Sequence, residues 1–332
     1  MNSLFLCLLA LLGGVVGLFA FTLWQTRRIE ALYPPVGARV AAVEEVVHLV
    51  ERPAIGPERG CVLLVHGASG NHADMMGALG EPLTALGFRT LAVDRPGHGW
   101  SSRFAGRRLS SPSRQAALIR AALASRGATQ AIVVVHSLAG VLGLAMALEA
   151  PAFTRGLVLL APVSHPWPGG VDWRYAVAST PWLGWLFRCL IVAPAGLLTM
   201  AAGVRSVFAP NAPPAGYIEA TKLPLVLRSA HFLANAEDVV DLKPFVEAQA
   251  VRYPAIRIPT AIVTGDRDGV VYTHIHSLGC ARDIPGATLT VLEGIGHSPH
   301  HSALDKVVAA ILDVERRAGA GENVKWAAEA SG

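Results

Sequence analysis

The stretch from Ala131 to Gly140 constrains the fold of this chain more than any other. Five apolar residues, four of them β-branched, lead into the pair His136-Ser137, and an Ala- and Leu-rich pattern of small residues follows. Such a pattern predicts a buried strand that turns sharply into a helix. A serine at this turn is exposed above the end of the strand and close to the first N–H groups of the helix. The pattern therefore predicts a nucleophile at Ser137.

Polar or glycine-rich turns follow the other strands that the sequence predicts. Residues 61–65 and 88–93 are short, buried apolar runs bounded by turns, and a helix is expected over 72–86. In a parallel sheet the carboxyl ends of the strands meet at one edge, so residues of these turns can assemble into one site. The turns after the predicted strands are His66-Gly67-Ala68-Ser69-Gly70-Asn71, Asp94-Arg95-Pro96-Gly97-His98-Gly99, Asp266-Arg267-Asp268 and Glu293-Gly294-Ile295-Gly296-His297.

Over residues 40 to 314, these segments together resemble the α/β-hydrolase fold family. The resemblance implies an α/β fold with a mostly parallel eight-stranded sheet, flanking helices and a helical cap insertion. It also implies a catalytic triad of Ser137, Asp268 and His297, in the chain order of the family. The backbone N–H groups of Ala68 and Leu138 occupy the positions of the family's oxyanion hole. The family needs no metal or cofactor, so neither is expected.

Two positions leave alternatives open. Asp266 is a rival to Asp268, although the family places its acid third after the glycine that is Gly265 here. The family's elbow reads Gly-x-Ser-x-Gly, and this chain has Val135 and Ala139 instead of the two glycines. A branched side chain at Val135 would sit where strand and helix come closest. A shifted helix, a misaligned oxyanion hole or a non-catalytic protein follows as an alternative.

The residue at the nucleophile position narrows the reaction class. Haloalkane dehalogenases and epoxide hydrolases of the capped type have Asp there, and Ser137 argues against both. We expect a serine esterase that cleaves a carboxylic ester of a small hydrophobic substrate through an acyl-enzyme. C–C bond hydrolysis, acyl transfer, perhydrolysis and a non-catalytic interaction protein stay open. A metal at His297, His300 and His301 is disfavoured, because no carboxylate or cysteine stands at ligand spacing.

The amino-terminal segment predicts a membrane anchor, with a cleaved secretory signal as the alternative. Residues 4–24 include no charged side chain, and at about 1.5 Å per residue a helix of that length spans a bilayer core of about 30 Å. Arg27, Arg28 and Arg39 follow the run. By the positive-inside rule they place the catalytic domain in the cytoplasm, behind a single transmembrane helix. Contact with membrane lipid is therefore expected through residues 4–24.

Composition excludes other classes and sets the predicted organisation. Among 332 residues with a net charge of +4, no basic cluster of the nucleic-acid-binding type occurs, and the four cysteines have no paired spacing. The cap is rich in Trp, and it is expected to line a hydrophobic pocket, to form a lid that touches the membrane, or simply to pack on the sheet. The predicted divisions are an anchor (1–28), a linker (29–39), the α/β core (40–163 and 256–316), the helical cap (164–255) and a disordered tail (317–332).

Overall fold

One eight-stranded sheet organises the protein, whose computed structural model describes residues 3–329 and the side chains up to residue 320. The strand order is β1-β2-β4-β3-β5-β6-β7-β8. The first two strands form an antiparallel hairpin whose second strand runs antiparallel to β4, and all other pairs are parallel. The strands are β1 Ala38–Ala42, β2 Glu45–Arg52, β3 Gly60–Val65, β4 Phe88–Val93, β5 Ala131–His136, β6 Thr154–Leu160, β7 Thr260–Gly265 and β8 Thr288–Leu292.

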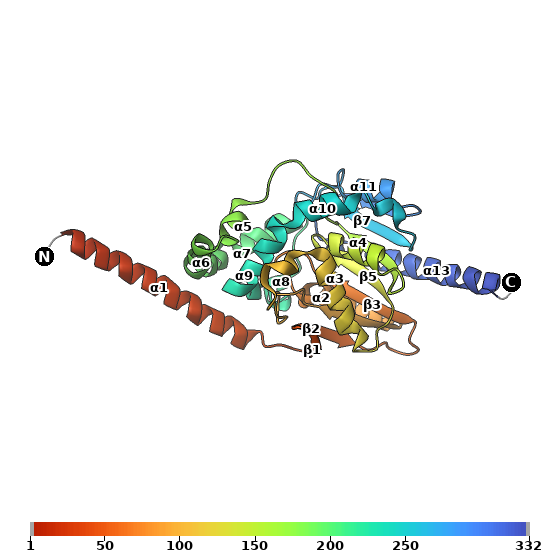
Figure 1. The fold of residues 1–332 in the computed structure, drawn as a ribbon, viewed down its shortest axis with the longest axis horizontal. Helices are drawn as coiled ribbons and strands as arrows, with labels where there is room; N and C mark the ends of the chain where they lie inside the picture. Colours follow the sequence, from red (N-terminus) through yellow and green to blue (C-terminus); the bar gives the residue numbers. More distant parts are fainter. Residues whose placement is uncertain (1–2, 330–332) are drawn as a thin grey trace.

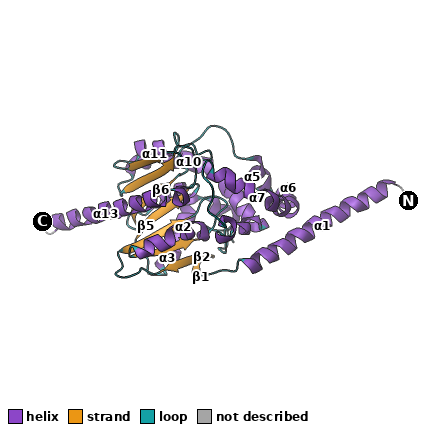
Figure 2. Ribbon diagram, turned by 180° about the vertical axis from the view of Figure 1, so that it is seen from behind, coloured by secondary structure: helices purple, strands orange, loops and turns teal. Residues whose placement is uncertain are grey.

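Helices cover both faces of this sheet (Figure 2). Alternation along the strands divides the core: Leu63 and Val65 of β3 face one apolar cluster, and Val62 and Leu64 face the other. The first cluster includes side chains of α3 (Pro112–Ala124), α4 (Ala139–Glu149) and α11 (Ser277–Asp283). The second includes side chains of α2 (His72–Ala85) and α13 (Leu304–Glu329). The predicted α/β-hydrolase fold is confirmed. Short helices η1 (Gly106–Ser110) and α12 (Pro299–Ser302) complete this part.

A helical insertion lies between β6 and β7, and Figure 1 shows its helices between the sheet and α1 (Ser3–Leu32). Its helix α9 reaches the carboxyl end of β4, where the Arg95 guanidinium donates to Asp238 at 2.5 Å in a fully buried ion pair. Removing one partner of such a pair leaves an uncompensated buried charge. The insertion consists of α5 Trp173–Ala178, α6 Trp182–Phe187, η2 Arg188–Val192, α7 Ala193–Phe208, α8 Tyr217–Ala220, η3 Leu223–Leu227, α9 Ser229–Val240, α10 Leu242–Ala250 and η4 Tyr253–Ala255.

The connection between α1 and the sheet is shorter than the sequence predicts. A linker was expected over 29–39, but α1 continues to Leu32 and β1 begins at Ala38. The reason is tertiary packing. Ile29 is 1% exposed and belongs to an apolar cluster with Val192 and Leu225 of the insertion. Pro34 and Pro35 therefore lie in the turn between Tyr33 and Gly37 rather than in a longer flexible segment.

The carboxyl-terminal segment also differs from the prediction. Disorder was expected from residue 317, but α13 continues through Glu329, and residues 330–332 lie outside the described part of the chain. Ala318 is buried, and the Arg317 guanidinium donates to the Thr260 carbonyl at 2.9 Å. The Gly- and Ala-rich composition suggested no periodicity, whereas contact with β7 stabilises the helix at these residues.

Two helical segments in residues 3–329 are long and apolar enough to cross a membrane. The first is α1, whose most apolar part is not buried against the rest of the described chain and which projects from one end of the molecule (Figure 1). The second runs from Trp182 to Phe208 through α6, η2 and α7.

Candidate active site

Ser137 lies at the sharp turn that the sequence predicts between β5 and α4. Its φ is 53°, a left-handed conformation that is unusual for a residue with a side chain. The strained turn is held by backbone bonds on both sides: the Ser137 N–H donates to Leu160 O at 2.9 Å, and the Ser137 carbonyl accepts from Gly140 N at 2.8 Å and Val163 N at 2.9 Å. The strain is thus supported by neighbouring β6 and by the loop that follows it.

Val135 fits at this elbow because a glycine lies opposite it on the helix. A Cβ built at Gly143 would lie 2.8 Å from Cγ2 of Val135, closer than real Cβ atoms approach other atoms. The small residue that lets the strand and the helix approach is therefore Gly143 on the helix, and the branched side chain of Val135 fills the space opposite it. Val135 is fully buried, and α4 still begins at Ala139 directly behind the serine. The shifted helix considered from the sequence is not required.

Ser137, His297 and Asp268 lie in one hydrogen-bonded row. His297 Nε2 is 2.9 Å from Ser137 Oγ, and His297 Nδ1 is 2.8 Å from Asp268 Oδ2. The other carboxylate oxygen, Asp268 Oδ1, accepts from the N–H groups of Val270 and Val271. Asp266 instead accepts from Gly294 N and lies on an exposed turn. Of the two candidate acids, the one that contacts the histidine is Asp268.

Two more histidines, His136 and His300, pack beside this row. His136 Nε2 donates to the His297 carbonyl at 2.9 Å, and the His136 ring lies between those of His297 and His300, with ring-centroid distances of 4.8 and 4.5 Å. Burial, reinforced by His300 and His297, holds the pKa of His136 well below its ordinary value. His136 is therefore neutral, and its hydrogen bond to the His297 carbonyl holds the backbone of His297 in place.

The turn after β3 lies against the serine. A Cβ at Gly67 would be 2.9 Å from the Ser137 Cβ, so only glycine permits this approach. In the next residues, Ala68 packs on the apolar cluster that contains Leu138. Within residues 3–329, neither the Ala68 nor the Leu138 N–H donates to another protein group. Both predicted oxyanion donors are thus available at this turn and at the elbow.

Sequence reasoning missed the residue that holds this turn. Ser69 has a φ of 56°, and its N–H donates to Asn235 Oδ1 at 2.6 Å. Asn235 Nδ2 in turn donates to Ser69 Oγ at 3.2 Å. Asn235 lies on α9 and is fully buried. No sequence signal connects residue 235 to residue 69, because only the insertion's packing brings them together.

A second group of the same residue types lies at the end of β6. Ser164 Oγ is 2.8 Å from His165 Nδ1, and His165 Nε2 is 3.1 Å from Asp283 Oδ2. However, Ser164 is fully buried, and its hydroxyl donates to the His276 carbonyl at 2.9 Å. A hydroxyl has one proton to donate. His165 therefore has no proton to accept from Ser164, and the group is structural.

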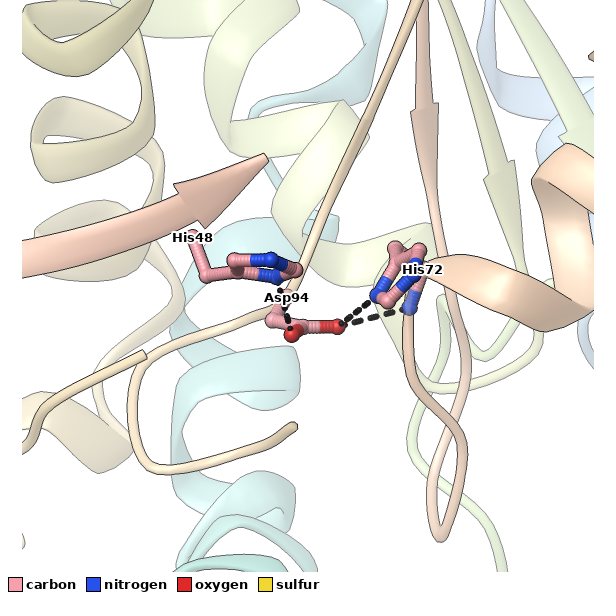
Figure 3. A group of neighbouring side chains, drawn as sticks. All are labelled: His48, His72 and Asp94. Carbon is pink, nitrogen blue, oxygen red and sulfur yellow. Dashed lines mark hydrogen bonds and ion pairs between the residues drawn. The ribbon is translucent and has the colours of Figure 1, made fainter. Parts of the chain in front are cut away.

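Two histidine and carboxylate clusters bring possible metal ligands together. In the first, His48, His72 and Asp94 are buried side by side (Figure 3). The Asp94 oxygens accept four bonds, from His48 Nδ1, Trp100 N, His72 N and His72 Nδ1, at 2.7 to 2.9 Å. Four donors fill the lone-pair sites of a carboxylate. Burial alone would raise the pKa of Asp94, but the bonds to His72 and His48 hold it well below its ordinary value.

The second cluster lies around Asp74, where α2, α8 and α12 meet. Asp74 accepts from Tyr217 Oη and His301 Nε2 at 2.9 Å each, and it lies 3.3 Å from His300 Nε2. Burial opposes ionisation of Asp74, but its two histidine partners hold the pKa well below its ordinary value. The carboxylate that the sequence lacked beside His300 and His301 thus comes from α2. Both clusters are explained as hydrogen-bonded anchors, Asp94 for the start of α2 and Asp74 for α8 and α12.

Comparison with known proteins identifies the family of the chain. The model of the alpha/beta hydrolase family matches residues 62–310, three quarters of the chain. The chain belongs to the alpha/beta hydrolase family. This hydrolase resembles the esterase of Exiguobacterium antarcticum, with a TM-score of 0.68 at 18% identity, over 85% of this chain and 100% of that one. No curated protein matches it.

Two further solved structures are similar. An alpha/beta hydrolase fold protein from Nakamurella multipartita is 25% identical, with a TM-score of 0.61 over 85% of this hydrolase and 99% of that chain. A bacterial membrane phospholipase A, described as a virulence factor, is 20% identical, with a TM-score of 0.66 over 95% of this chain and 99% of that one. These likenesses agree on the fold, which positions the residues above.

Proposed function

We propose that this hydrolase is a serine esterase that cleaves a carboxylic ester of a hydrophobic substrate through an acyl-enzyme. The observation that carries the proposal is the row from Ser137 Oγ through His297 to Asp268, with 2.9 and 2.8 Å separations, at a strained elbow. These are the distances at which a base can take a serine proton in the ground state. Each partner also follows a different strand of the sheet, β5, β7 or β8, so the sheet fixes their relative positions.

In the proposed reaction, Ser137 Oγ attacks the ester carbonyl carbon while its proton passes to His297 Nε2. Asp268 Oδ2 accepts a hydrogen bond from the Nδ1–H of His297, which leaves the Nε2 lone pair free to act as the base and stabilises the imidazolium. The tetrahedral intermediate expels the alcohol, which leaves with the proton from His297. A water then repeats the sequence on the acyl-serine and releases the carboxylic acid.

We assign the oxyanion hole to the N–H groups of Ala68 and Leu138. Neither donates elsewhere in the described chain, and Gly67 holds the turn against the Ser137 side chain. Each such donor contributes about 2.7 to 4 kcal/mol to the transition state. Since the groups belong to the backbone, the side chains at these two positions are free to vary.

The substrate is proposed to be hydrophobic, and the insertion supports this. The end of α7 lies against the turn that carries His297, where Gly296 N donates to Asn211 Oδ1 at 2.9 Å, and Trp167 packs on the apolar cluster that contains Leu138. The similar solved structures include an esterase and a membrane phospholipase A. An ester with a lipophilic acyl or alcohol group fits these observations, whereas no residue of the site favours C–C cleavage or acyl transfer over hydrolysis.

The protein is further proposed to be anchored by α1 in a membrane, with its catalytic domain on the cytoplasmic side. The most apolar part of α1 is not buried, and Arg27 and Arg28 follow it. The match to the membrane phospholipase covers 95% of this chain, which leaves about 17 of 332 residues unmatched. That number is smaller than the 30 residues of α1, so the likeness extends into this helix.

The test is activity-based labelling of the full chain in detergent micelles. A fluorophosphonate should label the wild-type protein and the Ser164→Ala variant, but not the Ser137→Ala variant. A series of p-nitrophenyl esters from acetyl to dodecanoyl should then show faster turnover of the longer acyl groups. A folded wild-type protein that is neither labelled nor active would refute the esterase, and a preference for short acyl groups would refute the hydrophobic substrate.

A further inference from the structure

The surface of α5, α6 and α7 is unusual for a protein face in contact with water. Between Tyr175 and Val204 the only charged side chain is Arg188, which is buried, with its guanidinium bonded to the Ala178 carbonyl. The exposed large apolar side chains of these helices, and of η2 between α6 and α7, are Trp173, Trp182, Leu183, Trp185, Leu186, Ile191, Leu197, Leu198 and Val207. Trp182 is 87% exposed and Leu198 86%. We call this set the apolar face of the insertion.

The apolar face adjoins α1. Phe19 contacts Trp185, with ring centroids 6.2 Å apart, and the buried residues Thr22, Gln25 and Ile29 follow at helical spacing on the same side of α1. Arg228 of the insertion forms an ion pair with Glu30 at 3.2 Å. Both views show α6 and α7 beside α1 and away from the sheet (Figures 1 and 2). The relation between α1 and the apolar face is therefore set by side-chain packing.

The contact between Phe19 and Trp185 determines how far along α1, and so how deep in a membrane, Trp185 would lie. The uncharged run of α1 ends at Trp24, with Arg27 and Arg28 just beyond it, as at a membrane–water interface. Phe19 precedes Trp24 by five residues, which is about 7 to 8 Å along a helix. A tilt of about 20° changes this depth by less than 1 Å. If α1 spans the bilayer, Trp185 must lie below the headgroup level, because it contacts Phe19 at that depth.

We propose that the apolar face of α5, α6 and α7 is seated in the lipid bilayer, at an interfacial depth beside α1. Burial of about 5 to 10 Å is typical of helices that lie in the interface plane, and it agrees with the depth of Trp185. The inference rests on the proposed anchoring of α1 and does not depend on the esterase activity.

A second transmembrane span is a weaker interpretation of the same helices. Arg188 begins η2 in the first third of α6–η2–α7 and is held inward by the Ala178 carbonyl. Val192 and Ala193, and then Val204 and Phe208, are buried against the rest of the protein. One side of this segment is thus packed on the folded domain at both ends of α7. Only the opposite side is free to contact lipid.

The test measures the depth of spin labels on the full chain in vesicles of phosphatidylethanolamine and phosphatidylglycerol at 3:1. Single cysteines are introduced into a Cys7→Ala, Cys61→Ala background, because the other two cysteines are buried. Leu183→Cys reports on the apolar face and Leu198→Cys on α7. Leu11→Cys reports on α1, and Val251→Cys is the matched control, an apolar residue that is 79% exposed at the end of α10. Power saturation compares collision with oxygen, which partitions into lipid, and with a water-soluble nickel chelate.

The labels at Leu183 and Leu198 should resemble that at Leu11, with oxygen collisions several-fold more frequent than at Val251 and nickel collisions correspondingly rarer. Nickel access at Leu183 equal to that at Val251, with Leu11 in lipid, would overturn the proposal and leave the anchor intact. Shielding from both reagents together with spin–spin broadening would assign the face to a second copy and also overturn it. Nickel access at Leu11 would refute the anchor and the proposal together. Ester hydrolysis by the labelled chains is measured separately, so loss of the proposed activity is not confused with loss of membrane contact.

Discussion

Within residues 3–329, two groups place a serine, a histidine and an aspartate in one row, and they differ in the geometry of the serine. In both, the hydroxyl lies within 2.9 Å of an imidazole nitrogen and the second nitrogen faces a carboxylate. Ser137 stands at a strained elbow beside free N–H groups, whereas Ser164 is fully buried with its proton given to a carbonyl. Residue types and distances therefore do not identify an active site. What distinguishes the two groups is which acceptor each hydroxyl proton is bonded to and how much space surrounds the hydroxyl.

Replacing each serine gives the largest contrast between the two groups. Ser137→Ala should lower kcat for ester hydrolysis by about 10⁶-fold, since the remaining groups cannot replace the nucleophile. Ser164→Ala should leave kcat unchanged within a few-fold, because its partner is a structural carbonyl. Steady-state kinetics on the full chain measure both. Equal losses in the two variants would mean that the second group also serves the reaction.

The two carboxylates should differ in the same direction. Asp268→Asn should reduce kcat by about 10⁴-fold, because the amide favours the wrong tautomer of His297. Asp283→Asn should have little effect on kcat, since Asp283 is partly exposed and its nearest partner besides His165 is Arg282. Comparable kcat values for Asp268→Asn and wild type would contradict the assignment of the acid.

The second group should instead contribute to acid sensitivity of the fold. His276 Nδ1 accepts from the N–H groups of Ser164 and His165, and burial, reinforced by His165, lowers the pKa of His276 to about 4. In the unfolded chain a histidine binds its proton near pH 6.5. The free energy of unfolding is therefore full above pH 6.5 and falls as the pH drops toward 4, by about 3 kcal/mol from this group.

Denaturant titrations between pH 7.5 and 4.5 measure this loss. His276→Asn keeps an acceptor but cannot bind the proton, so its free energy of unfolding should fall less steeply with acid than that of wild type. His274→Asn, at an exposed neighbour, should follow the wild-type slope. Parallel slopes for all three proteins would exclude His276 as a source of the acid sensitivity.

Asn235 offers a smaller effect on the catalytic group alone. Asn235→Ala removes the acceptor for the Ser69 N–H and should misplace the neighbouring Ala68 N–H, which lowers kcat by about 10- to 100-fold with little change in KM. Arg107→Ala is the control, because it breaks a partly exposed ion pair between the core and Asp241 of the insertion without touching the turn. A similar loss of kcat in both variants would indicate general loosening of the insertion.

The smallest expected effect concerns the elbow itself. Gly143→Ala should destabilise the protein by about 1 to 3 kcal/mol through overpacking against Val135, and adding Val135→Ala should restore part of that loss. Gly77→Ala, in open space on α2, should instead be stabilising by up to about 1 kcal/mol. Thermal unfolding measures all three. An unchanged Tm for Gly143→Ala would show that the strand and helix are not in tight contact there.

Local patterns in the sequence were sufficient for the fold. The run of β-branched residues before Ser137 and the turns after the other strands predict parallel strands whose ends meet, and burial on both faces of the sheet explains why these runs are uniformly apolar. The same patterns correctly predict that Ser137, His297 and Asp268 follow three different strands. In the folded chain these three residues lie close together, and their catalytic roles are proposed.

What the sequence by itself determined is therefore the set of strands, their ends and the residues that stand there, because these depend on neighbours along the chain. Tertiary structure alone decided the rest. Gly143 opposite Val135, Asn235 beside Ser69, Asp74 beside His300 and the extension of α1 and α13 all depend on contacts between residues far apart in sequence. Packing and buried hydrogen bonds act through space, so residue spacing along the chain cannot encode them in a form that a single sequence reveals.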